Sequence, residues 1–240
     1  MKLLKLAFKR ETAVPMLALT FASAVCLVLV SARILWTGQL RYGFLIWNLF
    51  LAWLPLLFAL LACEKYRNGS GRNWRFLGLA GAWLLFFPNA PYIFTDLIHL
   101  TRGYFAHFWV DLVLILSCAL TGLVLGFLSL FLMQSVVMRM FGRAASWLFI
   151  GGVAGLSGIG MFVGRFLRLN SWDVLLKPLA LSRGIGHLAA NPSGHFGSVA
   201  LAGLFATFLF IAYLMLYALT HLRVQPELNS FQPALENPPR

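Results

Sequence analysis

The chain has 240 residues, of which 60% are hydrophobic and only 11% are charged, and its mean hydropathy is +0.83. A soluble domain of this length does not need so much apolar surface, and several apolar runs exceed the roughly 18 residues that mark a membrane span. The net charge of +12 would suit nucleic acid, but the Lys and Arg residues gather at the ends of the apolar runs. That pattern sets membrane topology, so we predict a membrane protein with no nucleic-acid partner.

The apolar runs predict helices, because spanning segments must satisfy their own backbone hydrogen bonds and these runs lack the alternation of barrel strands. We expect an all-α, polytopic membrane helix bundle of about six transmembrane helices, forming one domain over residues 1–222. The predicted spans cover residues 13–32, 43–63, 76–101, 108–133, 146–164 and 196–220. The tail, 223–240, is rich in Pro, Asn, Gln and Glu, and we expect it to be disordered.

The first apolar run follows a basic N-terminus, and two interpretations compete for it. It resembles a secretory signal whose cleavage motif would be Val30-Ser31-Ala32. However, it is longer than the usual apolar region of a signal peptide and more spans follow it, so an uncleaved first span is predicted. The cysteines also fall inside apolar runs with no pairing pattern, which indicates buried free thiols: Cys26, Cys63 and Cys118.

The third predicted span contains two prolines, Pro88 and Pro91, within an otherwise apolar run. Proline has no backbone N–H, and it disfavours helical dihedrals in the residue before it. We therefore expect this helix to be broken, with Phe87 and Ala90 outside the helical region and Asn89 capping the second half. The span would reach about 39 Å as a helix, against a hydrocarbon core of ~30 Å, which predicts a tilted or partly interfacial second half.

The second half of this span carries a polar stripe. At about 100° per residue, Asn89, Tyr92, Asp96 and His99 fall within roughly 80° of one another. The fifth predicted span is rich in glycine, and the pairs Gly151/Gly155 and Gly160/Gly164 have the spacing that lets helices approach closely. We interpret these glycines as packing residues.

Membrane topology follows from the distribution of positive charge. Six spans place the N-terminus, the loops 64–75 and 134–145 and the C-terminal tail on one side, with 12 of the 19 Lys and Arg residues. Seven lie on the other side, four of them in the long loop 165–195. The positive-inside rule therefore predicts that both termini are cytoplasmic.

This topology brings many polar residues to the extracytoplasmic face, including all three aspartates and four of the five histidines. The candidate ligand-binding residues there are Asn48, Asn89, Tyr92, Asp96, His99, Asp111, Arg165, Arg168, Asn170 and Asp173. Asp111 lies just inside the fourth span and needs a cationic partner, for which Arg165 or Arg168 is the nearest candidate by side.

Each of these residues has several interpretations. Asp96 and His99 are candidate catalytic residues, candidate metal ligands together with His187 or His195, or simply interfacial groups in contact with water. Arg165 and Arg168 suit phosphate clamping, pairing with an aspartate, or contact with lipid headgroups. No cofactor is predicted, and the metal interpretation is the weaker one because the Asp-x-x-His spacing is common by chance.

Three motifs lead to a resemblance. Residues 87–100 read Phe-Pro-Asn-Ala-Pro-Tyr-Ile-Phe-Thr-Asp-Leu-Ile-His-Leu, residues 48–55 read Asn-Leu-Phe-Leu-Ala-Trp-Leu-Pro, and residues 164–173 read Gly-Arg-Phe-Leu-Arg-Leu-Asn-Ser-Trp-Asp. In these segments the chain resembles a family of bacterial membrane proteins known as a domain of unknown function. The resemblance implies a multi-pass protein of the bacterial inner membrane, and it assigns no activity, ligand or catalytic residue.

Three functions remain in competition. The polar cluster would bind a ligand, an anionic or phosphate-bearing lipid headgroup, or a membrane-protein partner in a non-enzymatic binding, transport or accessory factor. Alternatively, the chain is a membrane-embedded enzyme that acts on a lipid-linked or phosphorylated substrate at the outer face. In the third interpretation the cluster only locks the fold.

Overall fold

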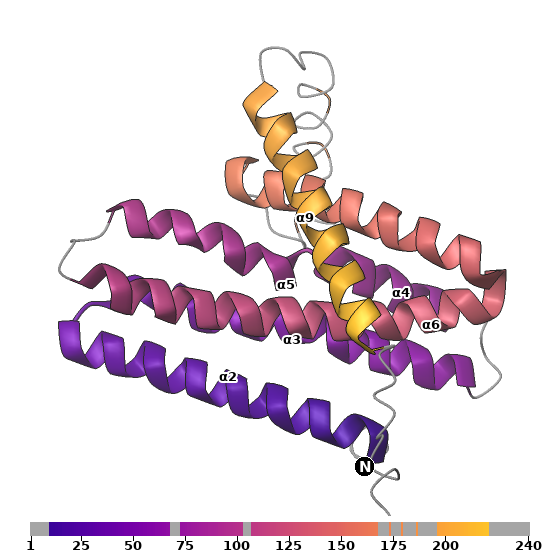
Figure 1. Cartoon of the computed structure of the whole chain (residues 1–240), viewed down its shortest axis with the longest axis horizontal. Coiled ribbons are helices and arrows are strands. Elements are labelled where there is room, and N and C mark those ends of the chain that lie inside the picture. Colours follow the sequence, from indigo (N-terminus) through magenta and orange to yellow (C-terminus); the bar gives the residue numbers. More distant parts are fainter. Residues whose placement is uncertain are drawn as a thin grey trace, which may run out of the picture.

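The computed structural model describes residues 10–67, 73–102, 107–167 and 196–220, together with the single residues 173, 179 and 186. Every regular element in these segments is helical, so the predicted all-α class is confirmed (Figure 1). The elements are α2 (Arg10–Thr37), η1 (Leu40–Tyr42), α3 (Phe44–Lys65), α4 (Trp74–Phe86), α5 (Asn89–Tyr92), η3 (Ile93–Arg102), α6 (Phe108–Phe162), η5 (Val163–Leu167) and α9 (Phe196–Thr220). The predicted tail lies outside the described residues.

Five helices are long and apolar enough to cross a membrane: Ala13–Thr37, Phe44–Lys65, Trp74–Leu100, Phe108–Arg165 and Val199–Thr220. The fourth has 58 residues, which at 1.5 Å per residue is about 87 Å, far more than the ~30 Å of the hydrocarbon core. It therefore contains both the fourth and the fifth predicted spans. The helices are thus compatible with about six crossings.

The chain reverses direction inside α6 at Gly142, where the backbone has φ 86° and ψ 177°. A positive φ is strained for a residue with a Cβ atom, so glycine suits this corner. The limbs before and after it fold back along one another (Figure 1). The prediction of a loop over 134–145 is wrong, because helix continues up to Gly142 and resumes after it, and one residue makes the turn.

The third predicted span is broken near its prolines, but not in the expected manner. Phe87 keeps helical dihedrals, φ −54° and ψ −42°, and Ala90 lies within α5, so the expectation that both leave the helical region is wrong. Asn89 does not cap α5. Its Nδ2 donates instead to the carbonyl oxygen of Phe86 (2.9 Å), one of the acceptors that the end of α4 leaves unpaired.

Beyond Tyr92 the chain continues as the 3₁₀ helix η3 rather than as α-helix. A 3₁₀ helix has three residues per turn, so side chains three positions apart lie above one another. Asp96 and His99 are three apart and come close for this reason.

The segment α5 packs closely on the first limb of α6, because two glycines there leave room for it. A Cβ atom at Gly122 would lie 2.8 Å from the carbonyl oxygen of Ala90, and one at Gly126 would lie 2.9 Å from the Ala90 Cβ. This is the small-xxx-small arrangement of membrane helices. The prediction for Gly151 and Gly155 is wrong, because a Cβ at either would meet no described atom within 4 Å.

The second limb of α6 makes close contacts at Gly160, as predicted for the second glycine pair, and at Gly158, which was not singled out. The backbone of Ala202 in α9 passes against Gly158, and Pro88 would lie 3.0 Å from a Cβ at Gly160. The limbs are also tied to α4 through Trp83, which donates to Ser129 Oγ (3.1 Å) on the first limb and stacks on Phe149 of the second. These contacts hold the broken third span between the two limbs.

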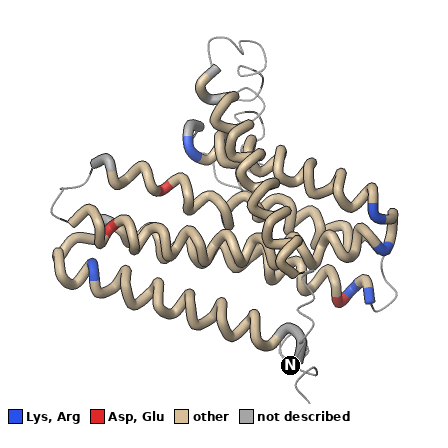
Figure 2. Tube along the Cα trace, viewed as in Figure 1, with Lys and Arg blue, Asp and Glu red and all other residues tan. Residues whose placement is uncertain are grey.

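The charged residues lie toward the two ends of the helices, and the middle of the bundle is free of them in the described segments (Figure 2). Many large apolar side chains face outward along the same middle region. This distribution fits helices that cross a hydrocarbon layer.

Candidate functional site

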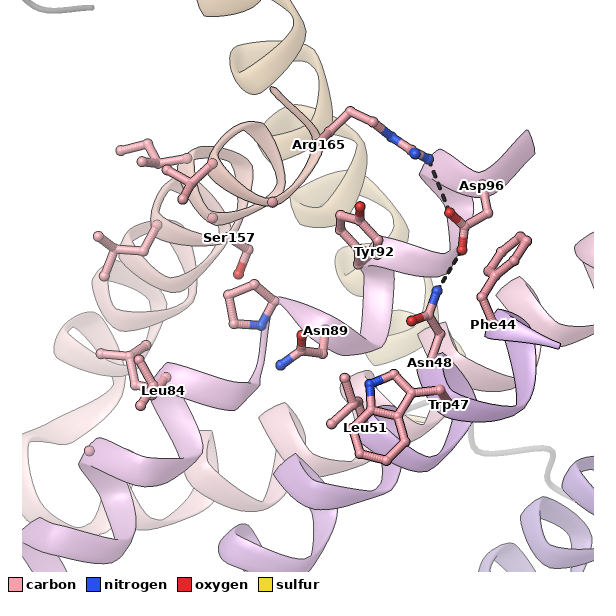
Figure 3. Close-up of a pocket in the computed structure, with 18 of the residues that line it drawn as sticks. Phe44, Trp47, Asn48, Leu51, Leu84, Asn89, Tyr92, Asp96, Ser157 and Arg165 are labelled. Carbon is pink, nitrogen blue, oxygen red and sulfur yellow. Dashed lines mark hydrogen bonds and ion pairs between the residues drawn. The ribbon is translucent and has the colours of Figure 1, made fainter. Parts of the chain in front are cut away.

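A cavity of about 580 Å³ lies among α3, the α4–α5–η3 segment and the second limb of α6 (Figure 3). Its volume falls within the ~300–1,000 Å³ that is typical of small-molecule sites. The polar side chains that line it are Asn48, Asn89, Tyr92, Asp96, His99, Ser157 and Arg165. The large apolar ones are Phe44, Trp47, Leu51, Leu84, Leu85, Leu156, Ile159 and Val163.

Asp96 lies at the centre of the charged end, and only 2% of its surface is exposed. One carboxylate oxygen, Oδ2, accepts a hydrogen bond from Asn48 Nδ2 (2.8 Å), and the other, Oδ1, accepts one from Arg165 Nη2 (3.1 Å). A buried carboxylate needs such partners, because the loss of hydration is otherwise uncompensated. Three separate elements, α3, η3 and η5, therefore meet at one side chain.

Arg165 reaches Asp96 from η5, a π-helical turn at the end of the second limb of α6. Its Nη2 also donates to the carbonyl oxygen of Thr95 and to Thr95 Oγ1 (2.9 Å), and its Cζ lies 5.4 Å from the centre of the Tyr92 ring. Every hydrogen bond that the described residues give Arg165 uses Nη2. Its side chain keeps 20% of its surface exposed, so Nη1 and Nε remain as donors for a ligand.

His99 stands beside this ion pair. Its Nε2 lies 3.9 Å from Asp96 Oδ1, and its ring is 4.9 Å from the ring of Phe44. Its side chain is 31% exposed. His99 therefore lines the cavity beside the carboxylate, as the polar stripe of the third span predicts.

The charged side chains of the cavity lie at one end of it. In Figure 3, Asn48, Asp96 and Arg165 gather at one end, whereas Leu84 lies at the opposite end. A site of this form suits a molecule with a polar group at one end and hydrocarbon at the other.

The prediction that Asp111 pairs with Arg165 or Arg168 is wrong, because its partner is Arg33 of α2. Arg33 donates from Nε to Asp111 Oδ1 (2.7 Å) and from Nη2 to Oδ2 (3.3 Å), and the Tyr42 hydroxyl donates to Oδ2 (2.8 Å). Arg33 lies near the C-terminal end of the first span, just as Arg165 lies at the C-terminal end of the fifth. The predicted side of the membrane is the same for both arginines and could not distinguish them as partners of Asp111. The packing of the helices decides the pairing.

The structure thus brings six of the ten predicted ligand-binding residues to one cavity and places Asp111 in a separate ion pair. Asp173 is buried but does not line the cavity, and Arg168 and Asn170 lie outside the described residues. His187 and His195 also lie outside them, so the wider metal set stays a prediction. In the described segments, no three His, Cys, Asp or Glu residues lie close enough together to hold a metal ion.

Sequence reasoning missed Ser157 at the cavity, Thr95 beside Arg165, and Arg33 and Tyr42 in the second ion pair. Thr95 contributes its backbone carbonyl to Arg165, which no side-chain pattern reveals. Arg33 had a usable signal: it is a charged residue at the end of a span, on the same predicted side as Asp111.

The comparisons with curated proteins and with solved structures give no match. A family model described as "Protein of unknown function (DUF1361)" matches residues 47–215, which include nearly all of α3, the broken third span, both limbs of α6 and all the cavity residues from Trp47 onward. This match covers more than half of the chain, and the protein therefore belongs to the DUF1361 family.

Proposed function

We propose that this chain is a multi-pass protein of the bacterial inner membrane, and that its cavity binds the headgroup of an anionic amphiphile at the extracytoplasmic face. The observation that carries the proposal is the division of one 580 Å³ cavity between a charged end and an apolar end. The five apolar helices support a bilayer environment, and the excess of Lys and Arg on the opposite side supports cytoplasmic termini.

The arrangement of Arg165 favours an anionic group over a neutral one. Asp96 and Thr95 hold Nη2 in place, and Nη1 and Nε, which point to opposite sides of the planar guanidinium, can then each donate a single hydrogen bond. A phosphate or carboxylate oxygen accepts a charge-assisted hydrogen bond from such a donor, which is stronger than one to a neutral acceptor. Asp96 thus orients the arginine while leaving the remaining donors for the ligand.

The apolar end favours an amphiphile over a free ion. Leu84, Leu156 and Ile159 line it, and all three are at least one-third exposed. In a bilayer those surfaces meet acyl chains, so hydrocarbon can pass from the membrane into the cavity. A ligand with an anionic head and an apolar chain would satisfy both ends at once.

The test is lipid retention measured by native mass spectrometry on the purified protein. We expect phosphatidylglycerol, which is anionic, to stay bound in preference to phosphatidylcholine, and Arg165→Gln to abolish this preference. The matched control is Arg143→Gln, because Arg143 is an exposed arginine beside the Gly142 corner. Equal retention of both lipids by the wild type, or an equal effect of both substitutions, would refute the proposal.

A second candidate is an enzyme that acts on a lipid-linked or phosphorylated substrate. It is favoured by His99, which is partly exposed at the cavity with Nε2 3.9 Å from Asp96 Oδ1, an arrangement suited to acid–base work. Under this proposal His99→Ala and Asp96→Asn leave the fold intact and remove turnover or a stoichiometric bound metal. If both variants merely unfold and the protein is metal-free, the cluster is a structural lock.

The proposed topology has its own test. A reporter that is active only in the periplasm, fused after residue 240, should give no signal, and the same reporter inserted between residues 103 and 106 should give one. A periplasmic signal from the C-terminal fusion would mean that one predicted span does not cross.

A further inference from the structure

A second, smaller cavity lies on the other side of the second limb of α6. Its volume is about 330 Å³, and it is enclosed by η3, the second limb of α6 and α9, with Phe94, Met161, Leu201 and Phe205 among its walls. Almost all of its surface is apolar. The polar atoms of Thr95 do not change this, because Thr95 Oγ1 already donates to the Tyr92 carbonyl (2.7 Å) and accepts from Arg165.

The two cavities occupy the same stretch of α6 on opposite faces. The larger one is lined by Leu156, Ile159 and Gly160, and the smaller one by Gly158 and Met161. They lie at the same level of the helix, and Arg165 at its end lines both of them. The guanidinium group therefore lies at the end of a helix that has a cavity on each flank, with the apolar end of the larger one on one side and the apolar smaller one on the other.

We infer that the ligand of the proposed site is a phospholipid with two acyl chains, which straddles the end of the second limb of α6. This rests on the proposed function and specifies its ligand. The phosphate binds Arg165, one chain extends past Leu84 and Leu156, and the other enters the smaller cavity past Leu201 and Phe205. The alternative ligand class, a phosphate carried on one long isoprenoid chain, fills only one of the two cavities.

Packing is the physical reason that two chains are favoured over one. Apolar cavities without free polar groups do not hold water well, and the atoms of an empty cavity wall lack partners for dispersion attraction. The acyl chains of the surrounding bilayer are the hydrocarbon available to occupy such a cavity. Because lipid chains outside are as apolar as the cavity wall, the gain comes from packing rather than from transfer out of water, and it is modest.

The test compares two ligands with the same phosphoglycerol headgroup and different numbers of acyl chains. In detergent, purified full-length protein is offered phosphatidylglycerol and its one-chain lyso form at equal concentration, and bound lipid is counted by native mass spectrometry. A packing gain of this kind predicts a preference of about 10-fold for the two-chain lipid. Leu201→Trp, which fills the smaller cavity, should reduce the ratio toward one while lyso-lipid binding is unchanged.

Two variants keep the result interpretable. Leu204→Trp adds the same bulk at a position that is 67% exposed, and it should keep the wild-type ratio. Phe205→Trp narrows the same cavity from a second position, in case Leu201→Trp does not fold.

The outcomes separate this inference from the function on which it rests. Equal binding of one-chain and two-chain lipids by the wild type, a Leu201→Trp ratio equal to that of Leu204→Trp, or a preference for a polyprenyl phosphate would overturn the two-chain inference alone. Failure of the wild type to retain any anionic lipid, or retention that Arg165→Gln leaves unchanged, would overturn the proposed function as well.

Discussion

Replacement of Asp111 by asparagine tests the second ion pair, which joins α2 to the start of α6. The substitution keeps the shape of the side chain and removes its charge. Arg33 then stays buried, at 7% exposure, with a neutral partner. In the described structure its Nη1 has no hydrogen-bond partner, and the hydrogen bonds from its Nε and Nη2 both go to Asp111.

The expected cost follows from that geometry. Removing one partner of a buried ion pair typically costs about 3–5 kcal/mol, because an uncompensated charge remains inside. Asp111 lies in the first turn of α6, near the end of a span, so water reaches the site more easily than it reaches mid-membrane. We therefore expect Asp111→Asn to lower the free energy of unfolding by about 3 kcal/mol, the low end of that range.

The assay is unfolding in mixed micelles of increasing SDS mole fraction, followed by far-ultraviolet circular dichroism. A triple variant supplies the control: Arg33→Met, Tyr42→Phe and Asp111→Leu together replace the polar cluster by apolar groups of similar size. Such replacement of a whole buried network is often close to neutral, so the triple variant should recover most of the loss. A loss below about 1 kcal/mol for Asp111→Asn, as for an exposed pair, would refute the reasoning, and so would a triple variant less stable than the single one.

Two further predictions concern packing. Gly122→Ala should destabilise the protein by about 1–3 kcal/mol in the same assay, because the new methyl group meets the Ala90 carbonyl oxygen. Its control, Gly78→Ala in α4, has open space around the new atom and should raise stability by up to about 1 kcal/mol. Trp83→Ala should cost about 3–5 kcal/mol, because Trp83 is fully buried, whereas the exposed Trp74→Ala should cost far less. Equal effects within either pair would contradict this packing.

Much of the candidate site could be predicted from the polar residues of the third span. Asn89, Tyr92, Asp96 and His99 line one cavity, as the periodicity predicts, although the segment is largely 3₁₀ rather than α-helical. The prediction is robust because residues three or four apart stay near one face in either helix type. The capping role predicted for Asn89 was wrong, because it depended on Phe87 leaving the helical region, which it does not do.

Partner choice was the part that the sequence could not decide. Arg33 and Arg165 both lie at span ends on the same predicted side, and so do Asp96 and Asp111, which leaves two consistent pairings. The packing of α2 beside the start of α6 gives Arg33 to Asp111, and the π turn of η5 gives Arg165 to Asp96. Each of these two ion pairs depends on how far its helices are rotated about their own axes.

The amino-acid sequence by itself determined that this protein is a bundle of apolar helices with charged residues at their ends. Helix formation and the positions at which spans end depend only on local hydrophobicity and on the order of the spans. The tertiary structure decided the one-residue corner at Gly142, the close packing of Ala90 against Gly122 and Gly126, and the two cavities that flank the limb ending at Arg165. These features arise from the distance and rotation between helices, which no single run of sequence encodes.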